Sequence, residues 1–128
     1  MAKFDYTGKV AMIVDRRENA RHSLNSVLAN ELGFDATPFG GKSSPTVLLD
    51  NNVNYHLLVL GELPKKGVSR FELTRSFKQI SPSGKIIYLS PIERPRIFAR
   101  GTQAYLPCDS KGYFDSSILD SLLRELKP

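Results

Sequence analysis

Arginine is concentrated in one short segment of the chain, where Arg94, Arg96 and Arg100 lie shortly after Tyr88. A guanidinium holds a phosphate through two parallel hydrogen bonds and stacks on flat rings, and a tyrosine ring can also stack on a purine. The segment is therefore a candidate site for a cyclic dinucleotide, and the spacing of Arg96 and Arg100 is that of some cyclic di-GMP sites. A solvated basic face and a protein-docking patch are the alternatives for the same residues.

The other potentially reactive side chains stand alone in the sequence. His22 and His56 have no second histidine, cysteine or spaced carboxylate set beside them, so we expect no metal site. Ser90 lacks the flanking glycines of a nucleophile elbow, and we do not expect an enzyme. The single cysteine, Cys108, cannot form an internal disulfide, and Asp109 beside it opposes a reactive thiolate. The sequence thus predicts no catalytic residue and no resident cofactor.

Length and composition predict one folded domain. The chain has 128 residues, 41% hydrophobic and 24% charged, which is typical of a globular domain of roughly 100–200 residues. We expect a single domain over residues 1–128 with its core in 9–126. The net charge of +5 permits a phosphate-bearing partner without requiring one.

The sequence shows no secretory signal, no membrane span and no DNA-binding motif. The N-terminus does not have the layout of a secretory signal, and the longest apolar runs are far shorter than the roughly 20 residues of a membrane span. We therefore expect a cytoplasmic protein without a membrane span. Basic residues alternate with acidic ones and no helix-turn-helix pair is evident, so direct DNA binding by this chain is not expected.

Short apolar runs alternate with segments of helical periodicity along the whole chain. The runs predict five strands, at residues 10–14, 34–39, 55–60, 86–89 and 103–106. The intervening pattern predicts helices at 18–32, 45–51, 69–80 and 115–126, while two prolines allow at most a short or irregular helix within 90–101. Strict alternation of this kind predicts an α/β fold, a three-layer, doubly wound, five-stranded parallel sheet in the flavodoxin-like order 2-1-3-4-5.

In such a sheet the functional crevice lies beyond the carboxyl ends of the first and third strands. This places Asp15, Arg16 and the loop 61–64 at its mouth. Arg16 could form an ion pair with Asp15 or Glu62 and act as a structural clamp, or could join Arg17 in binding an anion. We favour the clamp, because a cation there offsets the repulsion between carboxylates without a metal.

The order of these pieces resembles the receiver domain of two-component response regulators, from Lys9 to Leu126. The resemblance is carried by Val-Asp at 14–15, the leucine-rich third strand leading to Leu-Pro at 63–64, Ser90 after the fourth strand, and Ala-Tyr-Leu at 104–106. It implies a signalling function in which an aspartate at the end of the third strand accepts a phosphoryl group. Two adjacent acids for magnesium, a hydroxyl after the fourth strand and a lysine after the fifth complete that site.

Compared with this pattern, the magnesium and acceptor positions are degenerate. Asp15 matches the first acid, but Arg16 stands where the second would be, so the pair that holds a hard cation is lost. The acceptor position falls at Leu60, or at Gly61 if the loop is one residue shorter, and neither has a nucleophilic oxygen. Glu62 is the nearby carboxylate and the conceivable unusual acceptor.

Of the two remaining positions of the receiver site, one matches the receiver pattern and the other does not. Ser90 matches the hydroxyl position, whereas the lysine position falls at Cys108, or at Pro107 after a one-residue slip. Because phosphoryl transfer needs metal, acceptor and countercharge together, the resemblance implies a pseudo-receiver that retains the fold without the phosphorylation chemistry.

The leading hypothesis is therefore a noncatalytic module that docks to protein domains of the same or a partner signalling protein, such as a histidine kinase or a transcription regulator. The expected surface comprises the segment 90–101, the strand 103–106 and the exposed side of residues 116–126, and it could also form a dimer. The residues of interest there are Arg94, Arg96, Arg100 and Tyr105. The alternative is a cyclic di-GMP sensor that uses the same arginines with Tyr88.

Overall fold

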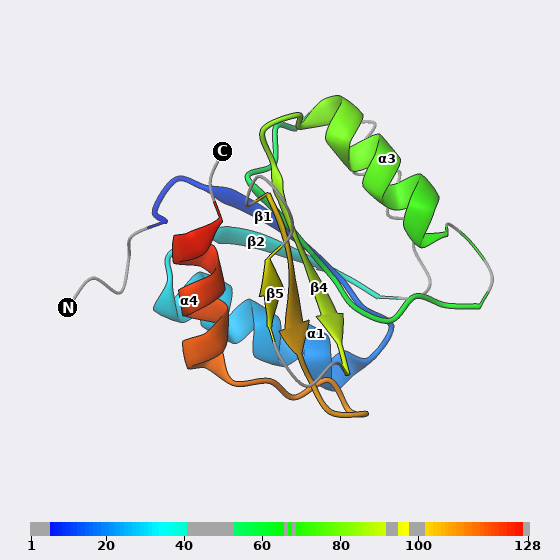
Figure 1. Cartoon of the computed structure of the whole chain (residues 1–128), viewed down its shortest axis with the longest axis vertical. Coiled ribbons are helices and arrows are strands. Elements are labelled where there is room, and N and C mark those ends of the chain that lie inside the picture. Colours follow the sequence, from blue (N-terminus) through cyan, green and yellow to red (C-terminus); the bar gives the residue numbers. More distant parts are fainter. Residues whose placement is uncertain are drawn as a thin grey trace.

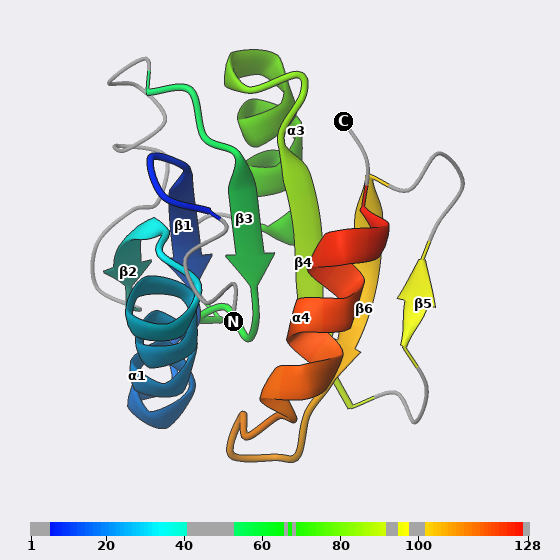
Figure 2. The ribbon, with the colours of Figure 1, turned by 90° about the vertical axis from the view of Figure 1, so that its left-hand side faces the viewer.

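A mainly parallel β-sheet with helices on both faces forms the architecture of the computed structural model, which describes residues 6–40, 53–65, 67, 69–91, 95–97 and 102–126 (Figures 1 and 2). The strand order is β2-β1-β3-β4-β6-β5. The strands are β1 (Val10–Val14), β2 (Asp35–Phe39), β3 (Leu57–Leu60), β4 (Lys85–Ser90), β5 (Arg96–Ile97) and β6 (Gln103–Pro107). The predicted α/β fold with parallel strands and intervening helices is confirmed.

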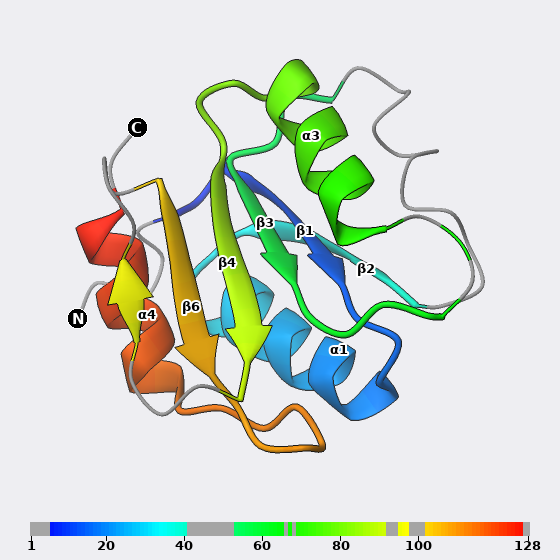
Figure 3. The ribbon, with the colours of Figure 1, turned by 45° about the vertical axis from the view of Figure 1, so that its right-hand side comes forward.

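The sheet contains the five predicted parallel strands and one further strand that was not predicted. All pairs among β2, β1, β3, β4 and β6 are parallel, but β5 adds a sixth strand that runs antiparallel to β6 at the sheet edge (Figure 3). In this pair, Arg96 lies opposite Tyr105 and Ile97 opposite Ala104. Two exposed residues cannot display a strand period, so tertiary pairing alone defines β5. A strand, not a short helix, thus occupies 96–97, and most of the remaining segment lies outside the described residues.

The first helical region is divided into two parts. An α-helix, α1 (Glu18–Asn25), continues into the π-helical turns of η1 (Ser26–Glu31), where the sequence predicts one helix over 18–32. The N–H of Leu32 donates to the carbonyl of Val27 at 3.0 Å, a wider turn than in an α-helix. The predicted apolar face is correct, because Ala20, Leu24 and Leu28 are all fully buried.

Both later helices begin at side-chain caps. The N–H of Glu72 donates to Ser69 Oγ at 3.1 Å before α3 (Arg70–Ile80). The N–H of Ser117 donates to Asp115 Oδ1 at 2.9 Å before α4 (Ser116–Glu125). These contacts satisfy amides that the first helical turn leaves without partners. The predicted helix at 45–51 lies outside the described residues.

The sheet separates two apolar cores. Helices α1 and α4 pack on one face, and α3 packs on the other (Figure 2). Alternate residues of each strand enter opposite cores, as the pleat of a strand requires: Ile13 and Val59 face α1 and α4, whereas Met12 and Leu58 face α3. Within the described part of the chain, no helix combines the length and apolar character needed to cross a bilayer.

Candidate functional site

The carboxyl ends of β1, β3, β4 and β6 lie at one end of the sheet (Figure 2). A cavity of about 430 Å³ opens there, lined by Arg17, Gly61, Glu62, Arg70, Leu89, Ser90, Pro91, Cys108, Asp109 and Ser110. Backbone hydrogen bonds hold its rim together. Gly61 N donates to Val14 O at 2.8 Å, Arg16 N donates to Glu62 O at 2.8 Å, and Cys108 N donates to Ser90 O at 2.9 Å.

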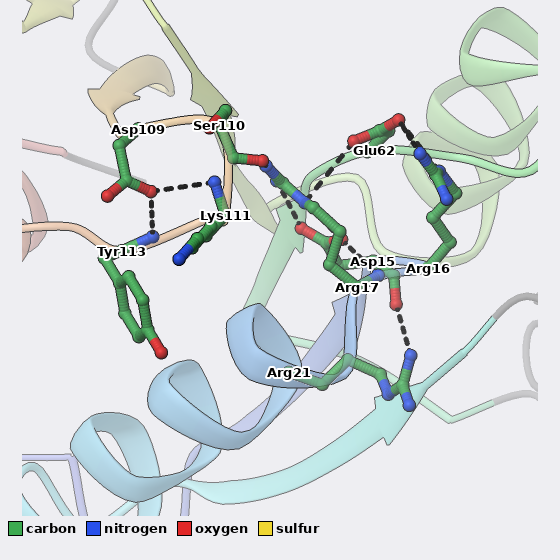
Figure 4. Close-up of polar contacts among 9 residues, drawn as sticks. All are labelled: Asp15, Arg16, Arg17, Arg21, Glu62, Asp109, Ser110, Lys111 and Tyr113. Carbon is green, nitrogen blue, oxygen red and sulfur yellow. Dashed lines mark hydrogen bonds and ion pairs between the residues drawn. The ribbon is translucent and has the colours of Figure 1, made fainter.

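A carboxylate and a guanidinium form a buried ion pair beside this cavity (Figure 4). Asp15 is fully buried, and the Arg17 side chain is 15% exposed. Arg17 donates from Nε to Asp15 Oδ1 at 2.9 Å and from Nη2 to Oδ2 at 2.7 Å, while its backbone N–H donates to Oδ1 at 2.8 Å. The hydrogen bond with Asp15 raises the pKa of Arg17 against the opposing effect of burial. Asp15 therefore has an internal cation on both of its oxygens.

Arg16 forms a separate and more exposed pair. Its guanidinium lies 2.5 Å from Glu62 Oε1, and the two side chains are 52% and 43% exposed. Glu62 Oε2 also lies 3.5 Å from Arg17 Nε, so the two pairs are linked. Of the two predicted partners of Arg16, the structure selects Glu62. The role of Arg17 as the partner of Asp15 was missed, although the Asp-x-Arg spacing just before a helix could have indicated it.

The two candidate acceptor positions carry no nucleophile. Leu60 is fully buried in the core beneath α3. Gly61 is also buried, and a β-carbon added to it would overlap Asp15 Oδ2. The nearby carboxylate of Glu62 is instead engaged by Arg16 and Arg17.

Ser90 and Cys108, which the resemblance to receivers assigns to the hydroxyl and lysine positions, both line the cavity. Burial raises the pKa of the Cys108 thiol, which outweighs the lowering effect of the nearby Arg17 guanidinium. The thiol is therefore neutral at neutral pH and supplies no countercharge to a phosphoryl group.

A magnesium ion, which the resemblance to receivers implies, does not fit these side chains. Proteins bind magnesium through one or two carboxylates while the ion keeps several waters, and both oxygens of Asp15 are already bound by Arg17. Arg16 adds positive charge at the position of the second acid. Across the described ranges, no three histidine, cysteine, aspartate or glutamate side chains gather as possible metal ligands.

The predicted ligand and docking residues lie on a different part of the sheet. Tyr88 and Tyr105 are neighbours in β4 and β6, with ring centroids 5.3 Å apart, and exposed Arg96 lies opposite Tyr105 in β5. The Arg70 guanidinium lies 5.5 Å from the centre of the Tyr88 ring, a contact that sequence reasoning missed because the two residues are far apart in the chain. Arg94 and Arg100 lie outside the described residues.

Comparisons with known proteins place this geometry in a known fold. No family model and no curated protein matches the chain. Among solved structures, the BeF3-activated DrrB receiver domain matches with a TM-score of 0.60 over 92% of this chain and 96% of that chain, at 19% sequence identity. At this identity the likeness concerns the fold, so the chain has the fold of a receiver domain.

Proposed function

We propose that this chain is a pseudo-receiver, a noncatalytic signalling module of a two-component or transcription-regulatory system that is not phosphorylated on aspartate. The observation that carries the proposal is the buried ion pair of Asp15 with Arg17. A guanidinium bound to both carboxylate oxygens takes the place of a divalent cation in neutralising Asp15, and it needs no metal supply.

The chemistry of phosphoryl transfer supports the same conclusion. Its catalysis comes from positioning and charge neutralisation, which require a metal, an acceptor and a countercharge at once. Here the acceptor position is Leu60 or Gly61, and the lysine position carries the neutral thiol of Cys108. Ser90 alone cannot supply these functions.

Incubation with acetyl phosphate and magnesium, followed by intact mass measurement, tests this part of the proposal. A phosphorylatable receiver treated in parallel serves as the positive control. The expected result is an unmodified chain. The gain of one phosphoryl group would overturn the proposal, and its loss in a Glu62→Gln variant would identify Glu62 as the acceptor.

Without a phosphoryl switch, we propose that the module acts by docking to other protein domains through β5, β6 and the outer side of α4. Arg96 and Ile97 are exposed on β5, with 40% of Ile97 accessible, and β5 is an edge strand. Edge strands present unpaired backbone groups that can pair with another chain, which also suits a dimer. The exposed residues of α4 add a polar surface on the neighbouring sheet face: Ser116, Ser117, Ser121, Arg124 and Glu125.

The docking surface is tested with a charge-reversing Arg96→Glu variant. We expect weaker binding to kinase or output domains of two-component proteins and a nearly unchanged melting temperature, because Arg96 is exposed. Analytical ultracentrifugation of the same variant and of the wild type shows whether this surface also forms a dimer. Unaltered affinity and unaltered self-association would exclude this face.

The row formed by Arg96, Tyr105 and Tyr88 supports a second candidate function, a cyclic di-GMP sensor. Residues in register on adjacent strands direct their side chains to the same face, so a guanidinium and two aromatic rings are presented together. Calorimetry with cyclic di-GMP distinguishes the candidates. A sensor releases heat at micromolar ligand and loses it in an Arg96→Ala variant, whereas a pure docking module gives no heat.

A further inference from the structure

The strands β1, β3 and β4 begin at the opposite end of the sheet (Figure 2). A second cavity lies there, among residues at and before the starts of these strands. Its volume is about 170 Å³, and its lining residues are Tyr6, Lys9, Phe34, Asn54, Tyr55, His56, Leu57, Ser83, Lys85 and Leu123. None of these residues belongs to the crevice of the proposed pseudo-receiver site. The cavity is therefore independent of that proposal.

Aromatic and aliphatic side chains form much of the cavity wall. The rings of Tyr6 and Phe34 are stacked, with centroids 4.6 Å apart and planes 10° apart. Leu57 from β3 and Leu123 from α4 are buried and add aliphatic surface. An engineered apolar cavity of roughly 150 Å³ holds a benzene molecule, so this space suits a single six-membered ring.

Hydrogen bonds to neighbouring strands fix the histidine of the cavity. Val10 N donates to His56 Nδ1 at 3.0 Å, and His56 N donates to Val10 O at 2.8 Å. Lys85 N donates to His56 O at 3.0 Å. Because Nδ1 accepts a hydrogen bond, the neutral ring carries its hydrogen on Nε2, which remains a donor. The imidazole is thus held in one orientation and one tautomer.

Positive charge from two lysines converges on this cavity. Lys9 and Lys85 line it beside His56, and none of the described lining residues is an aspartate or a glutamate. Among the residues that the structure describes, neither lysine lies within ion-pair distance of a carboxylate. Burial lowers the pKa of Lys85 and of His56, and the charge of Lys9 lowers both further. A bound anion would relieve this repulsion.

We infer that the cavity at the amino ends of the strands binds a small aromatic carboxylate, with the ring among the apolar side chains and the carboxylate facing Lys9 and Lys85. The size of the space selects one ring, the stacked aromatic wall favours a flat ligand, and the two lysines select an anion. A carboxylate that accepts hydrogen bonds from a lysine forms a charge-assisted contact, stronger than a neutral one.

Titration of the whole chain with benzoate, followed by backbone amide NMR, tests the inference. Benzamide serves as the uncharged ligand of the same shape, and inorganic phosphate as the anion without a ring. We expect saturable shifts at the amides of Phe34, His56 and Lys85 with benzoate, and binding at least about tenfold weaker with the other two probes.

Substitutions of the two lysines test whether they bind the benzoate carboxylate. Lys85→Met and Lys9→Met should each weaken benzoate binding about tenfold, while Lys111→Met, at an exposed loop position at the other end of the sheet, should leave it unchanged. Thermal melts confirm that each variant folds, and Lys9, which precedes β1, provides a second test if Lys85→Met is unstable. Absence of saturable shifts, equal binding of benzamide or phosphate, or benzoate affinity unaffected by both variants would overturn the inference.

Discussion

Gly61 lies directly against the Asp15 carboxylate, so that a β-carbon at position 61 would occupy the space of Asp15 Oδ2. The carboxylate is fully buried and fixed by Arg17, and it cannot move aside without losing its hydrogen bonds. The end of β3 is thus closed to any side chain at Gly61, including an aspartate that might restore an acceptor.

A Gly61→Ala substitution should destabilise the protein by about 1–3 kcal/mol, the usual cost of overpacking a filled interior. Urea unfolding measures the change. Gly40→Ala is the control, because the three atoms nearest to a β-carbon there all belong to the Arg21 guanidinium, the end of a flexible side chain that donates to the Asp15 carbonyl at 3.0 Å. Equal stabilities of the two variants would show that position 61 has room for a side chain.

Arg17→Met should cost about 3 kcal/mol of unfolding free energy, because it leaves the buried Asp15 carboxylate without its cation. Arg16→Met is the control within the same loop. It removes an exposed pair with Glu62 and should cost about 0–1 kcal/mol. Chemical denaturation of both variants gives the comparison. A larger loss of stability for Arg16→Met than for Arg17→Met would mean that Arg16, and not Arg17, forms the stabilising ion pair.

Stability should fall as pH decreases below about 6.5, in part through His56. Burial and then the charges of Lys9 and Lys85 lower the pKa of His56 in the folded protein. The unfolded chain therefore binds a proton at higher pH than the folded one, so this contribution is present above the unfolded pKa and is lost as pH falls toward the folded pKa.

A His56→Asn variant isolates that contribution, because the asparagine Oδ1 can accept the hydrogen bond from Val10 N in place of Nδ1. Thermal melts between pH 7 and pH 5 should show a shallower loss of stability in the variant than in the wild type. An equally steep loss in both proteins would mean that His56 is not the titrating group.

Periodic segments of the fold could be predicted from the sequence, and aperiodic ones could not. The apolar runs of β1, β3 and β4 and the helical face of Ala20, Leu24 and Leu28 follow directly from residue spacing. The strand β5 has two exposed residues and depends on pairing with β6. The π-helical turns of η1 likewise carry no signal, since their apolar spacing also fits an α-helix.

The sequence predicted where Asp15, Arg16 and Glu62 lie but not which arginine pairs with which carboxylate. Strand order places all three beyond the ends of β1 and β3, yet Arg17 rather than Arg16 binds Asp15. The choice depends on the turn after β1, where the Asp15 carboxylate accepts from the backbone N–H of Arg17 and draws its side chain inward. The second cavity had no local signal, because its lining runs from Tyr6 to Leu123.

A magnesium titration followed by amide NMR tests most directly whether Arg17 takes the place of the metal at Asp15. The account predicts no saturable shift at the amides of Asp15, Arg16 and Gly61 as magnesium is added to the wild-type chain. Saturable shifts centred on those three amides would mean that the carboxylate remains available to a divalent cation, and they would contradict the account.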